Sequence, residues 1–239
     1  MIFSNYFKHS KSPFYSFIFI LPLFIIYEFG ISAISSDDLP TIRNGADVFL
    51  RKVISTIGLN GIYGMGLLLL VGIMIAFFIN KGRFKNLSLQ SNYFILMIFE
   101  SLFWSAILFV ILSHGQLLLG TGTGKLLMQQ IVLSIGSGIF EEFVFRVLLV
   151  SGIALIVGIF IKKQYLYKMS ISIIIAAIIF SIFHFVGEYA DTPKINLFLL
   201  RLLAGIVLGY VYIFRGFGIA AYSHSFYNLI VFTQNVPAP

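Results

Sequence analysis

The sequence predicts an all-α fold, a polytopic transmembrane helical bundle with about seven to eight membrane helices. Hydrophobic residues make up 59% of the 239 residues and charged residues only 10%, whereas soluble globular proteins carry about 25% charged residues. The mean hydropathy is +0.99. The apolar residues also form several runs long enough to cross a hydrocarbon core of about 30 Å, and these runs lack the short alternating pattern of a β-barrel. A soluble fold is therefore excluded.

The basic residues of the chain gather at the ends of these apolar runs. The net charge is +7 and the pI is about 9.6, which in a soluble protein would favour a nucleic-acid partner. Here the clusters at Lys81–Lys85 and Lys162–Lys163 follow the positive-inside pattern of membrane proteins. We therefore expect membrane lipids, and no nucleic acid, as partners. The chain has no cysteine, which excludes disulfides and thiolate chemistry.

The N-terminal half predicts three spans and one helix at the membrane surface. The spans are expected at about Pro13–Ile34, uncleaved, and at Gly61–Asn80 and Tyr93–Leu112. Within Ser35–Leu59, apolar residues recur at helical spacing, which predicts an amphipathic interfacial helix. Those residues are Ala46, Leu50, Val53, Ile54 and Ile57. The first 120 residues contain no motif that indicates a chemical role.

The long apolar stretch Leu126–Ile161 predicts an irregular helix. As one straight helix its roughly 36 residues would measure about 54 Å, which exceeds the thickness of the hydrocarbon core. We expect it to be kinked, tilted, broken or extended beyond the bilayer. Four glycines are the expected weak points: Gly136, Gly138, Gly152 and Gly158.

Three more spans are expected, at Met169–Val186, Ile195–Phe214 and Phe217–Phe232. Gly205-x-x-x-Gly209 in the second of these permits close helix packing. If Leu126–Ile161 crosses the membrane once, the basic loops fall on one side. That arrangement places the N-terminus in the cytoplasm, with about seven crossings. The expected location is the inner (cell) membrane of a bacterium.

Glu141, Glu142 and Arg146 interrupt the long apolar stretch. Each carboxylate at the centre of a membrane helix costs about 2.5–3.5 kcal/mol on insertion scales, so such residues indicate a functional site. Glu142 and Arg146 are spaced i,i+4 and share one helical face, while Glu141 points about 100° away. Arg146 can therefore keep Glu142 ionised, leaving Glu141 free to face a cavity and abstract a proton from water. A buried salt bridge that only joins helices is the structural alternative.

Three further polar residues follow on the next spans. If the basic loop between the long stretch and the next span is a hairpin turn, His184 reaches the depth of Glu141 to within about 8 Å. His224 and Asn228 lie one turn apart on one helical face, an arrangement suited to two donors aimed at one oxyanion. Interhelical hydrogen bonding is the alternative for this pair.

The same residues leave a metal site open as an alternative. Glu141, His184 and His224 would form an acceptable catalytic zinc shell with one open position. However, the chain contains no His-Glu-x-x-His motif. No cofactor is therefore certain, and a divalent metal such as zinc is retained as an alternative.

Other charged residues within the predicted spans are Glu28, Glu100 and Arg201. They predict structural ion pairs, for example between Glu100 and Arg201, or the lining of a polar cavity.

The order of the three motifs resembles the CPBP family, the CAAX-protease and bacteriocin-processing intramembrane endopeptidases, also called the Abi family. Glu-Glu-x-x-x-Arg at Glu141, Phe-x-x-x-His ending at His184 and His-x-x-x-Asn starting at His224 follow one another on successive spans. The resemblance covers about Gly136–Ile230 and includes the stretch Arg201–Tyr212.

The resemblance implies hydrolysis of a peptide bond in a membrane-associated protein or peptide. In that interpretation Glu141 and His184 hold and activate the water, and His224 and Asn228 stabilise the oxyanion. Glu142 and Arg146 support the site. Residues 1–125 would form N-terminal membrane helices with the interfacial segment, and residues 126–232 the catalytic core, within one membrane domain.

Two other classes of function stay open. One is a bacteriocin-immunity or interaction protein that uses this scaffold without catalysis. The other is a proton-coupled transporter, since buried carboxylates and histidines also mark ion paths, although no inverted repeat is visible.

Overall fold

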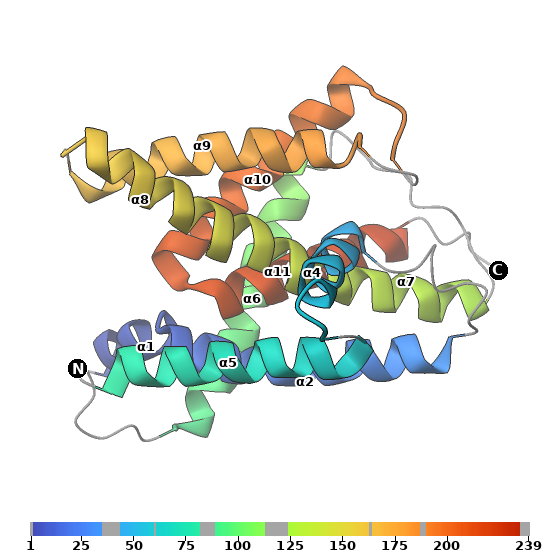
Figure 1. Cartoon of the computed structure of the whole chain (residues 1–239), viewed down its shortest axis with the longest axis horizontal. Helices are drawn as coiled ribbons and strands as arrows, with labels where there is room; N and C mark the ends of the chain where they lie inside the picture. The colour runs from blue at the N-terminus through green and yellow to red at the C-terminus, as the bar shows by residue number, and fades with distance from the viewer. Residues whose placement is uncertain are drawn as a thin grey trace.

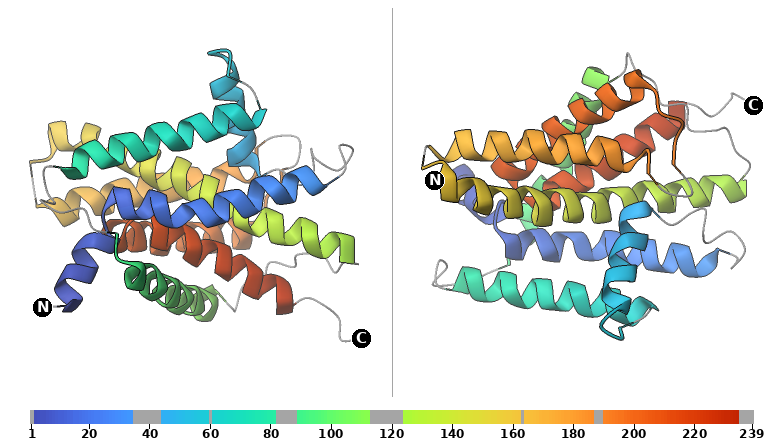
Figure 2. Two further views of the ribbon diagram at one scale, coloured as in Figure 1. Left: turned by 90° about the horizontal axis from the view of Figure 1, so that it is seen from below. Right: turned by 45° about the horizontal axis from the view of Figure 1, so that its top comes forward.

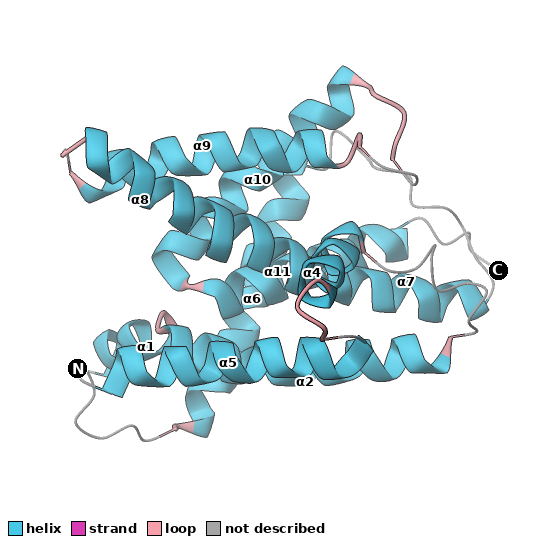
Figure 3. Cartoon of the chain, in the orientation of Figure 1, coloured by secondary structure: helices cyan, strands magenta, loops and turns pink. Residues whose placement is uncertain are grey.

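The protein is a bundle of helices, seen in a computed structural model that describes residues 2–34, 44–59, 61–81, 89–112, 124–162, 164–186 and 190–234. In these ranges every regular element is a helix (Figure 3). The helices of the N-terminal half are α1 (Ile2–Ser10), α2 (Pro13–Ala33), α4 (Gly45–Ser55), α5 (Gly61–Lys81) and α6 (Ser91–Leu112). Those of the C-terminal half are α7 (Gly124–Gly136), η2 (Ser137–Glu141), η3 (Phe143–Val150), α8 (Ser151–Phe160), α9 (Tyr165–Phe183), α10 (Ile195–Arg215) and α11 (Phe217–Gln234).

Five of the described helical stretches are long and apolar enough to cross a membrane. They are Pro13–Ala33, Ser91–Leu112, Leu127–Phe160, Tyr165–Phe183 and Ile195–Arg215. Helix α5 contains a shorter apolar stretch, Gly64–Ile79, and α11 is not among the five. The all-helical membrane class is thus confirmed, while the count of seven to eight spans is not.

Helix α11 lies at the centre of the bundle (Figure 1). It contacts α2 and α6 from the N-terminal half, and α7, α10 and both η segments from the C-terminal half. The largest group of buried apolar side chains likewise joins the two halves, with Tyr27 of α2 and Phe140 of η2 among its members. The division at residue 125 stays a prediction, but the two halves share one core.

The stretch from α7 to α8 runs as one long rod from one end of the bundle to the other (Figures 1 and 2). Leu127–Phe160 is therefore one continuous helical stretch of 34 residues that is apolar enough to cross a membrane, and its single crossing stays a prediction. Its end, in α8, lies at the same end of the bundle as α1. The membrane side on which that end lies stays a prediction.

The expected irregularity of this rod takes the form of π-helix. The π-helical segment η2 begins directly after Gly136, and η3 begins directly after Glu142, where the two segments meet. Such widened turns are rare and are often found at functional sites. A side chain at Gly138 would bring Cβ within 2.0 Å of Ser225 Oγ and 2.5 Å of the Ala221 carbonyl oxygen. Glycine there lets η2 and α11 come into close contact.

Helix α10 packs closely on α9, as the Gly205-x-x-x-Gly209 spacing predicted. A Cβ at Gly205 would lie 2.9 Å from the Ala177 side chain, and one at Gly209 would lie 2.6 Å from Ile173. The chain then turns at Gly216, whose φ of +90° is accessible to glycine with little strain. This turn sends α11 back through the centre of the bundle (Figure 1).

Helix α4 is the amphipathic helix that the sequence predicted, and it lies across the neighbouring long helices (Figures 1 and 2). Its N-cap is Asn44, whose side-chain Oδ1 accepts a hydrogen bond from the Ala46 amide at 2.8 Å. Leu50 and Ile54 are buried on its inner face, while Val53 is exposed. The position of α4 at the membrane surface stays a prediction.

Candidate active site

Glu141 and Glu142 lie where the two π-helical segments meet, and both are buried, with 5% and 0% of their surface exposed. Although they are adjacent, their carboxylates contact different partners. Burying two carboxylates is costly unless each is hydrogen-bonded or paired with a charge.

Glu142 is held by two cationic or ionisable side chains. Its Oε2 lies 3.0 Å from Arg146 Nε, which is the predicted i,i+4 pair. Its Oε1 lies 2.8 Å from His224 Nδ1 on α11. The Arg146 guanidinium also stacks 4.7 Å from the centre of the Phe180 ring on α9, a cation–π contact. Glu142 thus joins the long rod to α11.

Glu141 has a different environment. Its Oε1 accepts a hydrogen bond of 2.6 Å from Asn44 Nδ2. The nearest imidazole nitrogens are more distant: His184 Nε2 is 3.7 Å from Oε1, and His224 Nε2 is 3.9 Å from Oε2. Both separations exceed the length of a direct hydrogen bond and are short enough for one water molecule to bridge the groups.

The two imidazole rings are oriented by their Nδ1 atoms. His184 caps the end of α9, and its Nδ1 lies 2.9 Å from the Phe180 carbonyl oxygen, which can only accept. Its Nδ1 therefore carries the proton, and Nε2 of the neutral ring has a lone pair facing Glu141. His224 Nδ1 faces a carboxylate instead. When that ring is protonated, Nε2–H is a donor as well.

The predicted proximity of Glu141 and His184 is thus confirmed, and His224 joins them. Asn228 lies one turn beyond His224 on α11 and is partly exposed. Among the described residues, no hydrogen bond or ion pair joins Asn228 to the two glutamates. The structure therefore brings five of the six predicted residues into direct contact or within 4 Å of another member. The chemical roles of all six stay predictions.

The donor atoms of the site bear directly on the metal alternative. The two imidazole nitrogens face separate oxygens of Glu141, and the Asn44 amide already binds one of them. Across the described ranges, no group of three or more histidine, cysteine or acidic side chains is arranged to hold a metal ion. This geometry does not fit a zinc shell as it stands, and no step proposed below is routed through a metal.

The predicted pair of Glu100 with Arg201 is wrong. Glu100 instead pairs with Arg215, and Arg201 pairs with Asp191, which follows the end of α9. Glu28 pairs with Arg51 of α4 at 2.5 Å. Helical spacing does not determine which faces of different helices meet, and the partners of Glu100 and Arg201 lie at or beyond the end of a helix.

Asn44 is the site residue that the sequence analysis missed. Its Nδ2 donates to Glu141 and also, at 3.0 Å, to Ser137 Oγ one turn earlier in the same rod. The sequence carries one local signal, an asparagine directly before a helical pattern, which is typical of an N-cap. That signal predicts the start of α4 and contains nothing about a partner 97 residues away.

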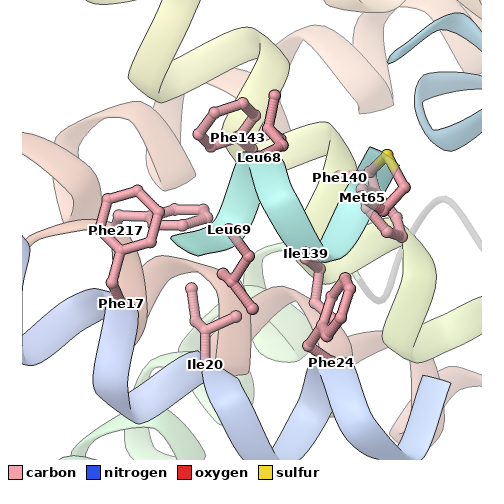
Figure 4. Close-up of a pocket in the computed structure, with 10 residues that line it drawn as sticks. All are labelled: Phe17, Ile20, Phe24, Met65, Leu68, Leu69, Ile139, Phe140, Phe143 and Phe217. Atoms are coloured by element: carbon pink, nitrogen blue, oxygen red, sulfur yellow. The ribbon is translucent and has the colours of Figure 1, made fainter. Parts of the chain in front are cut away.

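An apolar pocket lies beside the same rod (Figure 4). Ile139, Phe140 and Phe143 line it from the π-helical segments, opposite side chains of α2 and α5 such as Phe17 and Met65. Its empty volume is about 340 Å³, including the space open to its surroundings. No member of the polar site lines this pocket, so the pocket and the reacting groups are separate features.

The fold and the site together define the class: a helical membrane protein with a buried glutamate beside two histidines. Residues 123–230 match the family model of the type II CAAX prenyl endopeptidase, Rce1-like. This match is consistent with the CPBP family, so the predicted family resemblance is confirmed. No curated protein and no solved structure matches the chain.

Proposed function

We propose that this protein is an intramembrane endopeptidase that hydrolyses a peptide bond by means of a water molecule activated by Glu141. The family match supports the general class of intramembrane protease. The observation that carries the mechanism is the placing of Glu141 within 4 Å of two imidazole Nε2 atoms, without direct hydrogen bonds to either. A water molecule in contact with these three groups would be oriented for attack.

In the first step Glu141 removes a proton from this water, and the resulting oxygen nucleophile attacks the carbonyl carbon of the substrate. The C=O double bond becomes a C–O⁻ single bond, giving a tetrahedral oxyanion. The Nε2 lone pair of His184 accepts the second hydrogen bond of the water and so fixes its direction. Positioned general bases of this kind contribute about 10²–10⁴-fold to rate.

In the second step the oxyanion collapses, the C–N bond breaks, and the proton held by Glu141 passes to the leaving amine. His224, through Nε2–H, and the Asn228 amide would donate to the oxyanion before this collapse. Glu142 orients the His224 ring through its contact with Nδ1 at 2.8 Å. Arg146 in turn keeps the Glu142 carboxylate paired.

The decisive experiment compares new protein N-termini in membranes that contain equal amounts of wild-type protein or the Glu141→Gln variant. This substitution keeps the size of the side chain and an acceptor oxygen for Asn44, and it removes the base. We expect a set of N-termini in the wild-type membranes whose abundance is at least 10²-fold lower in the Glu141→Gln membranes. The positions of these termini would also identify the substrate, whether a prenylated CAAX peptide, a bacteriocin leader or another membrane protein.

Two matched arms make this comparison sharper. A second sample of wild-type membranes is treated with a chelator, because loss of cleavage there would show a metal requirement and replace the metal-free mechanism. Folding of both proteins is verified by thermal unfolding in detergent. Identical N-termini from two folded proteins would reject proteolysis in favour of a bacteriocin-immunity or interaction role.

A further inference from the structure

We propose that Asn44 is a positioning residue of the site, which fixes the carboxylate of Glu141 so that one of its oxygens takes the proton from water. This inference rests on the proposed function. It assigns a catalytic consequence to a residue of the N-terminal half, outside the matched segment 123–230. The observations that carry it are the contacts of the Asn44 amide and the way in which α4 is attached to α2.

The orientation of the Asn44 amide is determined by the helix that it caps. Its Oδ1 accepts the hydrogen bond from the Ala46 amide, so this atom must be the oxygen. The nitrogen Nδ2 therefore faces the rod, where it donates to Glu141 Oε1 at 2.6 Å and Ser137 Oγ at 3.0 Å. Both of its hydrogens are used, and neither end of the amide can turn without losing a contact.

This orientation makes the two oxygens of Glu141 unequal. Oε1 accepts the hydrogen bond from Asn44 and is also the oxygen nearest to His184 Nε2, at 3.7 Å. Oε2 is the oxygen that faces His224 Nε2 at 3.9 Å. The proton taken from water is therefore expected on Oε2. A carboxylate free to rotate would offer either oxygen and lose this alignment, which catalysis requires to within about 1 Å.

Asn44 is itself held in place because α4 is clamped to α2 by buried polar contacts. Arg51 lies 2.6 Å from Asp47 one turn earlier in α4 and 2.5 Å from Glu28 of α2. Asp47 also accepts a hydrogen bond of 2.7 Å from Tyr27. The Tyr27 ring packs edge-on against Phe140, the residue before Glu141, with the ring centres 5.0 Å apart.

The contacts of Arg51, Asp47 and Tyr27 therefore connect α4, through Phe140, to the same π-helical segment that carries Glu141. Asn44 reaches the carboxylate from one side of this closed loop of contacts, and Phe140 is braced from the other. A residue at a helix N-cap is well suited to this task, because its backbone is fixed by the first turn of the helix.

The test separates the two jobs of Asn44, capping α4 and holding Glu141. Asn44→Ser keeps a good N-cap and is too short to make the same contact with Glu141. Asn44→Ala removes both the cap and the contact. With a substrate identified from the wild-type N-termini, kcat and KM are measured for the three proteins in the same detergent.

We expect Asn44→Ser to lower kcat about ten-fold or more, as for loss of a hydrogen bond to a charged group, with KM within about two-fold of wild type. Asn44→Ala should lower kcat by a similar factor and also lower Tm further than Asn44→Ser, because the cap is lost as well. Restoration of wild-type kcat by serine would assign the whole effect to the cap and overturn the proposal.

A second measurement tests the contact without any substrate. Asn44→Ser and Glu141→Ala are combined in a double-mutant cycle on Tm. We expect Asn44→Ser to lower Tm clearly in the wild-type background and much less in the Glu141→Ala background. Additive shifts would overturn the contact itself. A coupled pair in a protein without proteolytic activity would instead refute the proposed function while retaining the contact.

Discussion

Two buried clusters of charged side chains in this protein differ in how completely their atoms are paired. At one end of the bundle Glu100 accepts from Tyr6 at 2.6 Å and from Arg215. Arg215 Nη2 also donates to Ser10 Oγ, and its Nη1 donates to the Phe7 carbonyl oxygen. In the candidate active site, Glu141 has one short hydrogen bond and two imidazoles at 3.7 and 3.9 Å. The atoms of the first cluster are thus paired directly, whereas the imidazole nitrogens of the second lie beyond hydrogen-bond distance of Glu141.

Burial of a carboxylate is therefore not by itself a mark of catalysis. Saturated pairs of this kind act mainly as structural ties, and removing one partner leaves an unpaired buried charge. Sites that perform chemistry need groups aimed at an atom that the resting protein does not supply. The following three changes should separate the two clusters experimentally.

The largest effect is expected on stability, at the saturated cluster. Arg215→Ala should lower the free energy of unfolding by about 3–5 kcal/mol, because Glu100 loses its cation while only 17% of its side-chain surface is exposed. Unfolding by a denaturant in detergent measures the change. Cleavage per folded molecule should be unaffected, and a large fall there would erase the distinction between the clusters.

The matched control for this change is the double variant Glu100→Gln/Arg215→Met. It removes both charges and keeps most of the volume, and such replacements are often close to neutral. We expect it to recover most of the lost stability. A double variant as unstable as Arg215→Ala would mean that packing, rather than the unpaired carboxylate, carries the effect.

The next effect is expected on activity alone, at the candidate active site. Asn228→Ala should lower kcat about 10²–10³-fold, equivalent to about 2.7–4 kcal/mol, if its amide donates to the oxyanion. Its Tm should stay near that of wild type, because Asn228 is partly exposed and makes none of the described contacts with the glutamates. Unchanged kcat would remove Asn228 from the proposed oxyanion hole.

The smallest effect concerns the approach of α11 to the rod. Gly138→Ala would place Cβ 2.0 Å from Ser225 Oγ and 2.5 Å from a carbonyl oxygen, and overpacking of this kind costs about 1–3 kcal/mol. Since Ser225 follows His224, we expect both Tm and kcat to fall. Gly152→Ala in the same rod is the control, because no described atom lies within 4 Å of the methyl group that alanine would add there. Equal losses in both variants would refute a specific contact.

Much of this fold follows from the apolar pattern, because a membrane helix is recognisable by its length and composition. The pair of Glu142 with Arg146 was also predictable, since both residues lie on one helix with fixed spacing. The approach of His184 to Glu141 needed only the hairpin that a short basic loop implies. In each case the information is local or crosses a single turn.

The remaining contacts could not be predicted from spacing, because they depend on how helices are rotated against one another. Arg201 was expected to reach Glu100 and instead pairs with Asp191, ten residues earlier in the chain. Asn44 reaches Glu141 only because α4 is clamped across α2. The π-helical segments were likewise expected only as an unspecified irregularity, with weak points at any of four glycines: Gly136, Gly138, Gly152 and Gly158.

The position of α11, the last helix of the described chain, has a consequence for biosynthesis. At roughly 5–20 residues per second, Glu141 and Glu142 are synthesised several seconds before His224 and Asn228. A nascent chain therefore contains the base of the site without its partners on α11, and Glu142 lacks the His224 contact during that interval. If the proposed function holds, a chain that lacks α11 is inert, and the activity of a newly made molecule begins only when α11 is in place.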